Sequence, residues 1–135
     1  MFLIDTSVWI DYFREKNTSE VRFFNKILDA KLPYGITSVI YQEILQGVAS
    51  KKDFNNLSGH LETQRFFHPK DPILTYKKAA ELYFKCRNKG ITIRSTIDCL
   101  IAEIAVEHEL SLLHHDKDYL QIQKLEPRLQ LVRVS

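Results

Sequence analysis

The sequence of 135 residues predicts an α/β fold, in which a mostly parallel central sheet lies between two layers of helices. Short apolar runs alternate with amphipathic helical segments along the chain, which is typical of parallel strand pairing. Glycine and proline are few, with four of each, and no repeat or linker divides the sequence. We therefore expect residues 1–135 to form one domain, with its ligand site at the carboxyl ends of the strands.

Five segments are predicted as strands. Residues 2–4 form a short apolar run, and residues 34–37 and 65–68 are similar runs that end near turn residues or a helix cap. Residues 110–115 form a further apolar run, and residues 129–134 alternate apolar and polar side chains as an edge strand does. The sheet is therefore expected to be built from short strands.

Helices are predicted between these strands, from apolar residues at helical spacing and from capping residues. The expected helices cover residues 8–14, a segment that begins near Asn17, 38–48, 51–62, 73–88, 96–108 and 118–124. Gly90 is placed to end the longest of them. The helix over 96–108 is apolar nearly all round, which predicts that it is buried.

Charge and cysteine content narrow the class of protein. The formal net charge is +2, from 19 basic and 17 acidic residues, which argues against a strongly basic nucleic-acid coat. Cys86 and Cys99 lack the spacing of a zinc site and are interpreted as reduced thiols in a cytoplasmic protein. The apolar start is too short for a signal peptide, and no stretch approaches the roughly 20 apolar residues of a membrane span. We therefore expect a cytoplasmic protein with no membrane partner.

Four acidic residues are candidates for a common site. Asp5 and Asp116 are each predicted to follow a strand, so both should project from the same edge of the sheet. Asp98 falls in the first turn of the buried helix, and Glu43 falls inside the helix over 38–48. Each also has a purely structural explanation. Asp5 and Asp116 are good helix N-caps, Asp98 with Ser95 fits a capping box, and Glu43 could face solvent.

The surroundings of two of these acids favour a chemical role. Glu43 shares its helix face with apolar Val39 and Ile40, and Asp98 shares its face with small alanines. An unpartnered carboxylate in such a place is costly, and several converging carboxylates raise one another's pKa values. A divalent cation resolves this conflict, and oxygen-only ligands suit Mg²⁺ or Mn²⁺. Such a cation can bind phosphate oxygens and activate water, which predicts a hydrolase of phosphodiester bonds.

Four blocks of the sequence resemble the PIN-domain family, and they come in that family's order. The blocks are MFLIDTSVW at residues 1–9, TSVIYQEI at 37–44, STIDCLIA at 95–102 and LLHHDKDY at 112–119. Within the family, the compact length and the presence of all four blocks make the chain most similar to VapC-type toxins of bacterial toxin–antitoxin pairs.

This resemblance implies a PIN-like three-layer α/β/α fold and an endoribonuclease that depends on Mg²⁺ or Mn²⁺. It implies that the acids at the metal are Asp5, Glu43, Asp98 and Asp116. It also implies a hydroxyl contact near the metal from Thr6 or Ser7, a homodimer, and a VapB-type antitoxin whose tail occupies the site.

Several neighbouring residues have weaker claims to the site. Asp118 could assist a second metal or simply cap the next helix, and Arg94, beside Ser95, could reach a substrate phosphate or remain a solvated loop residue. His114 and His115 suggest zinc, but neighbouring residues of a strand point to opposite faces and cannot easily bind one ion.

Two other functions remain open on the sequence alone. One is a PIN-type nuclease of RNA processing or a structure-specific nuclease, although such domains usually lie in longer chains. The other is a non-catalytic RNA-binding module with a decayed site, against which all four acids argue. Replacing Asp98 by Asn separates these classes, because a binding module keeps its function whereas a nuclease loses turnover.

Overall fold

The computed structural model describes residues 1–134 and contains a four-stranded sheet whose neighbouring strands are all parallel. The strands are β1 (Phe2–Ile4), β2 (Tyr34–Gly35), β3 (Ser111–Leu113) and β4 (Gln130–Leu131). Their order across the sheet is β2-β1-β3-β4, so β1 and β3 are central and β4 lies at an edge. The parallel α/β architecture expected from the sequence is confirmed.

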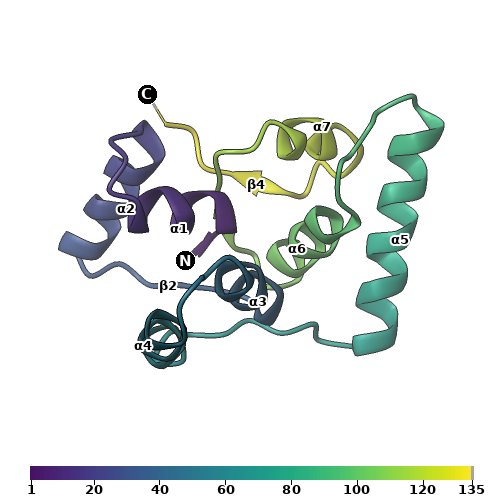
Figure 1. The fold of residues 1–135 in the computed structure, drawn as a ribbon. Helices are drawn as coiled ribbons and strands as arrows, with labels where there is room; N and C mark the ends of the chain where they lie inside the picture. The colour runs from purple at the N-terminus through teal and green to yellow at the C-terminus, as the bar shows by residue number, and fades with distance from the viewer. Residues whose placement is uncertain (135) are drawn as a thin grey trace.

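The helices lie around this sheet in two groups (Figure 1). They are α1 (Thr6–Phe13), α2 (Ser19–Asp29), α3 (Ser38–Gln46), α4 (Lys51–Leu61), α5 (Pro72–Asn88), α6 (Thr96–Glu107) and α7 (Asp118–Leu125). In one group α1 packs against α2 and α3, and α3 packs against α4; in the other, α5 packs against both α6 and α7. No helix in residues 1–134 is long and apolar enough to cross a membrane.

Helix starts follow the capping residues closely. Asp5 caps α1 by accepting from the Ser7 backbone N–H, so α1 begins two residues before the expected start. Thr18 caps α2, one residue after the expected start at Asn17. Gly90, at φ +73°, follows the last residues of α5 in the left-handed conformation that ends many helices.

Every predicted strand after residues 2–4 is shorter in the structure, and the segments 65–68 and 129–134 differ most from the prediction. Within residues 65–68, only Phe66 pairs, through an isolated bridge to Ile36. Gly35 permits this approach, because a Cβ there would collide with the Arg65 carbonyl oxygen and the Phe67 ring. The edge strand predicted over 129–134 is reduced to β4, because its partner β3 has only three residues to pair with.

The core lies between the central strands and the helices that cover them. As expected, α6 is buried on nearly all sides. Trp9 of α1 is 1% exposed, and its ring meets the Phe24 ring edge-on with centroids 5.0 Å apart. Its indole Nε1 is buried and has no hydrogen-bond partner among residues 1–134. Trp9 is therefore a core residue of α1.

Candidate active site

Asp5 is held at the carboxyl end of β1 by both backbone and side chain. Its N–H donates to the Leu113 carbonyl at 2.9 Å, which continues the ladder between the two central strands. Its carboxylate Oδ2 accepts from the Ser7 hydroxyl at 2.6 Å and from the Ser7 backbone N–H at 3.1 Å. The cap role considered for Asp5 is therefore real, and it fixes the carboxylate at the edge of the sheet.

Asp98 lies in the first turn of α6, beside this edge. Ser95 is the N-cap of the helix and accepts from the Ile97 backbone N–H at 3.2 Å. Within the described residues, the recorded side-chain partner of Asp98 is the Tyr119 hydroxyl, at 3.4 Å, rather than the backbone of Ser95. Asp98 therefore points toward the other acids instead of completing a capping box.

Asp116 lies three residues beyond the end of β3, farther from the strand than the sequence predicted. Its Oδ1 accepts from the Asp118 backbone N–H at 2.9 Å, at the start of α7. One ligand atom each from Asp98, Asp116 and Asp118 lies within 4.8 Å of the others. Asp118 is thus part of the acidic cluster, and its side chain is also buried.

Glu43 approaches from α3, and a threonine holds it. The Thr6 hydroxyl donates to Glu43 Oε1 at 2.7 Å. Burial raises the Glu43 pKa, the Thr6 hydrogen bond opposes this shift, and the charge of Asp5 adds to it. Thr6 therefore contacts an acid of the site, while Ser7 contacts another.

The clustering of acids has a clear electrostatic effect on Asp98. Burial is the largest cause, and together with the charges of Asp5, Asp116 and Glu43 it raises the pKa of this carboxyl to about 7. A pKa this high means that the ionised form of Asp98 is disfavoured, because too little positive charge lies near it. The site can relieve this repulsion by taking up a proton or by binding a cation.

Arg94 supplies the positive charge that the chain itself brings to this cluster. Its Nη2 lies 2.7 Å from Asp116 Oδ1, and its Nε lies 3.0 Å from Asp118 Oδ2. The Arg94 side chain is 66% exposed, so it lies over the rim of the cluster rather than within it. Arg94 is thus neither a free loop residue nor available to a phosphate without leaving its two carboxylates.

The two histidines follow β3 instead of lying within it, as the strand predicted over 110–115 required, and they face different partners. His115 Nδ1 lies 3.1 Å from Asp11 Oδ2, whereas His114 Nδ1 accepts from the Asp116 backbone N–H at 3.2 Å. Burial lowers the pKa of His114. The two rings therefore do not form a common metal site.

Comparison with known proteins identifies the family. Residues 2–125 match the model of the PIN domain. The chain belongs to the PIN-domain family. It is 31% identical over 120 residues to the VapC ribonuclease Mb1587 of Mycobacterium bovis and to ribonuclease VapC11 of Mycobacterium tuberculosis, a match that covers 88% of this chain and 89% of each relative.

Solved structures show the same PIN fold. VapBC2 from Rickettsia felis, bound to a DNA fragment from their promoter, has a TM-score of 0.73 at 20% identity and covers 99% of this chain and 98% of that one. A toxin–antitoxin complex from Klebsiella pneumoniae has a TM-score of 0.69 at 20% identity and covers 98% and 97%. These likenesses confirm the fold expected from the four sequence blocks.

Tyr119 is a site residue of this PIN domain that the sequence analysis did not identify. It lies in the first turn of α7, is fully buried, and donates from its hydroxyl to Asp5 Oδ1 at 2.8 Å. Burial and the nearby acids raise its pKa well above 10, so the hydroxyl remains a donor. The sequence does hold one signal for this role, a tyrosine three residues after Asp116. A buried tyrosine hydroxyl needs a polar partner, and the nearby acids can provide it.

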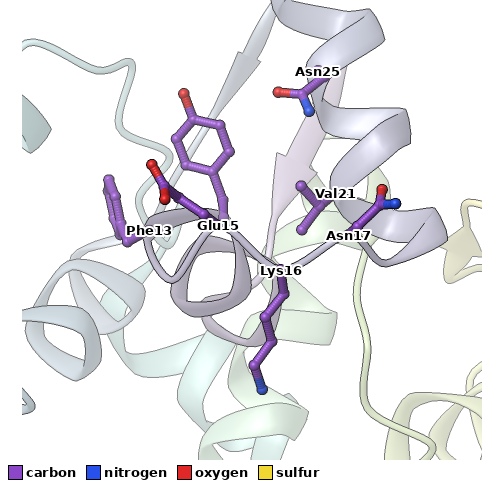
Figure 2. A pocket seen from close by; sticks show the side chains of 7 residues that line it. Phe13, Glu15, Lys16, Asn17, Val21 and Asn25 are labelled. Atoms are coloured by element: carbon purple, nitrogen blue, oxygen red, sulfur yellow. The ribbon is translucent and has the colours of Figure 1, made fainter.

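Two surface hollows lie near the N-terminal helices and the acids. One, of about 640 Å³, includes Asp116 and His114 and is bordered by the cations Lys117 and Arg133. The other, of about 570 Å³, lies between the end of α1 and α2, where Figure 2 shows its lining side chains. That second hollow contains none of the four predicted acids, so the hollow beside Asp116 is the one that adjoins the candidate active site.

The donor set of the PIN-domain site fits a hard divalent cation. The converging groups are carboxylate oxygens, which Mg²⁺ and Mn²⁺ prefer, and no cysteine takes part. The raised pKa of Asp98 is a second observation in favour, because a cation would stabilise the ionised carboxylate. The residues present are therefore suited to hold the metal that the sequence predicted.

Proposed function

We propose that this protein is a Mg²⁺- or Mn²⁺-dependent endoribonuclease, the VapC-type toxin of a toxin–antitoxin pair. The observation that carries the proposal is the convergence of Asp98 with Asp116 and Asp118 and the shift of the Asp98 pKa to about 7. The names of the mycobacterial relatives, which cover most of this chain, support the same activity. We also propose that residues 1–135 act as one catalytic domain.

Asp5, Glu43, Asp98 and Asp116 would hold the cation. When bound, the cation supplies the positive charge that polarises a phosphodiester and lowers the pKa of water. Asp118 lies close enough to Asp98 and Asp116 to contribute to the same site. Thr6 and Ser7 keep Glu43 and Asp5 in place through their hydroxyls.

The hollow beside Asp116 suits an RNA strand that leads to these acids. Lys117 and Arg133 border it and can attract phosphates, while Leu131 and Val132 give it an apolar wall. Arg94 can exchange its carboxylate partners for a substrate phosphate once a cation neutralises Asp116. Phosphate contacts of this kind position a strand without reading its sequence.

A VapB-type antitoxin and a second copy of the chain are the proposed protein partners. Structures that share this fold are described as VapBC pairs and as a toxin–antitoxin complex, which supports an antitoxin partner. The homodimer follows from the family resemblance, and sedimentation of the purified chain tests it.

The test is cleavage of total cellular RNA by the purified chain in Mn²⁺, in Mg²⁺ and in EDTA, beside the Asp98→Asn variant in Mn²⁺. We expect discrete cleavage in both metals and none in EDTA or with the variant. Sequencing of the RNA ends then identifies the substrate.

Other outcomes would contradict parts of the proposal. Cleavage that persists in EDTA or with Asp98→Asn rejects the site assignment. A folded protein that binds Mn²⁺ but cuts no RNA rejects the ribonuclease activity, and one that does not bind Mn²⁺ either favours the binding-module alternative.

A further inference from the structure

Tyr119 connects two acids that come from distant parts of the chain. Its hydroxyl donates to Asp5 Oδ1 at 2.8 Å and lies 3.4 Å from Asp98 Oδ1. Asp5 follows β1, Asp98 lies in α6, and Tyr119 belongs to α7, so three separate elements meet at one oxygen atom. This oxygen is fully buried.

The Tyr119 ring by itself does not explain the hydroxyl. The ring packs beside His114, with centroids 5.1 Å apart, and a phenylalanine would fill the same space. A buried hydroxyl is costly unless it has a partner, and both recorded partners of this one are carboxylates of the proposed metal site. The polar atom of Tyr119 is therefore directed to the acids.

The hydroxyl also completes the support of Asp5. Ser7 holds Oδ2 of this carboxylate from one side, and Tyr119 holds Oδ1 from the other. Within residues 1–134, the Asp98 carboxylate accepts its side-chain hydrogen bond from the Tyr119 hydroxyl. Each carboxylate oxygen has two lone pairs, and Asp5 Oδ2 uses both on Ser7. Asp5 Oδ1 and the Asp98 carboxylate keep acceptor sites free for a cation.

We propose that Tyr119 is a positioning residue, whose hydroxyl fixes the Asp5 and Asp98 carboxylates in the orientation that binds the divalent cation. The inference rests on the proposed function of the site, and its direct measure is metal affinity. Loss of such outer hydrogen bonds typically weakens metal binding or activity by about 10–100-fold.

The primary experiment is calorimetric titration of the full chain with MnCl₂. Tyr119→Phe, which removes only the hydroxyl, should bind Mn²⁺ about 10-fold more weakly than the unaltered protein. The matched control is Tyr41→Phe, because the Tyr41 hydroxyl also donates to a carboxylate, that of Glu62 at 2.9 Å, outside the acidic site. This control should keep the original affinity.

A kinetic readout separates positioning from a general loss of structure. Tyr119→Phe should cleave RNA slowly at limiting Mn²⁺, regain most of its rate at saturating Mn²⁺, and keep an unchanged KM for RNA. Incorporation of 4-aminophenylalanine at position 119 restores a donor and should restore Mn²⁺ affinity. If the Phe variant does not fold, 4-fluorophenylalanine fills the volume without donating and takes its place.

Unchanged Mn²⁺ affinity in folded Tyr119→Phe, or an equal loss in Tyr41→Phe, overturns the inference. So does an unaltered protein that does not bind Mn²⁺. If the unaltered protein binds Mn²⁺ and Tyr119→Phe weakens it but neither cuts RNA, the proposed ribonuclease function fails while the positioning role of Tyr119 stands.

Discussion

Helix α6 carries the half-buried Asp98 in its first turn and the buried Glu103 in its second, and the pKa of each is raised to about 7. Their surroundings differ. Burial and the neighbouring Glu126 raise the Glu103 pKa, but Arg128 binds Glu126 with both Nε and Nη2, at 2.9 and 2.8 Å, and lowers the Glu126 pKa to about 2.

Around Asp98, by contrast, the additional groups are mostly acids. Arg94 reaches Asp116 and Asp118, while Asp5 and Glu43 add charge that it does not contact. The comparison teaches that a raised pKa alone does not mark a metal site. The Glu103 cluster is balanced by one proton and one arginine of the chain. In the Asp98 cluster Arg94 contacts only two of the acids, which supports the proposed cation.

Replacing each of the two acids with its amide tests this contrast, and it should give the largest change in Mn²⁺ affinity. Asp98→Asn should weaken Mn²⁺ binding at least about 100-fold, beyond the typical cost of losing an outer hydrogen bond, because it removes a proposed ligand. Glu103→Gln, on the same helix, should change the affinity less than about 3-fold, because it acts only through distant charge. Titration calorimetry measures both, and equal effects would abolish the distinction between the clusters.

Removal of the internal counter-charge is the second test. Arg128→Met should lower the free energy of unfolding at pH 7.5 by about 1–2 kcal/mol, since it leaves the buried Glu103 and Glu126 carboxyls without their arginine. Part of this loss should return at pH 5, where a carboxyl takes up a proton. Urea unfolding followed by circular dichroism measures the change; an unaffected stability would mean that the exposed arginine is fully replaced by water.

The third test follows stability against pH in EDTA. The Asp98 pKa is about 7 in the folded chain and about 3.9 in the unfolded chain, so the folded state binds more protons between these values. This contribution is fully present below about pH 4 and is lost as the pH rises through 7. Linkage over about three pKa units sets an upper limit of roughly 4 kcal/mol. Because Asp98 is only half-buried, we expect Asp98→Asn to be at least about 1 kcal/mol more stable than the unaltered protein at pH 8.

That advantage of Asp98→Asn should shrink toward pH 5 and reverse when saturating Mn²⁺ is added, because only the carboxylate binds the cation. Thermal unfolding at several pH values measures it. A difference that does not vary with pH would show that the Asp98 carboxyl does not titrate in this range.

The smallest effect concerns Arg94. Arg94→Gln should raise Mn²⁺ affinity about 2–5-fold at low salt, because it removes a cation from Asp116 and Asp118 that is well exposed to solvent. Lys117→Gln is the control, because it also removes an exposed positive charge close to these acids. Lys117 lies at the N-cap of α7, and its side chain makes no capping hydrogen bond that the substitution would break. Equal gains in both variants would indicate a general charge effect rather than competition at the carboxylates.

The residues that could be predicted from the sequence are those whose local patterns decide their position. Asp5 ends an apolar strand and caps a helix, and Asp98 follows the cap Ser95, so both positions follow from short-range rules. The strand over 65–68 was overestimated because an apolar run does not reveal its partner: pairing stops at Ile36, just before α3 begins at Ser38.

Contacts between distant elements could not be predicted in the same way. The bridge from Tyr119 to Asp5 spans 114 positions, and the hold of Arg94 on Asp118 spans 24. Both depend on how α7 packs against α6 and against the end of β1, which no single segment encodes. The position of Asp118 in the cluster depends on the same packing, because its side chain faces the other acids only when α7 lies against α6.

The position of Trp9 has a practical consequence. It is the only tryptophan of the sequence, and it lies on α1 four residues after Asp5, enclosed by aromatic rings. An indole removed from water emits at shorter wavelengths than one in solvent, so a single native fluorophore reports whether α1 is seated on the sheet. Its emission spectrum can therefore report, without any label, whether the packing of α1 beside Asp5 changes as Mn²⁺ is added or removed.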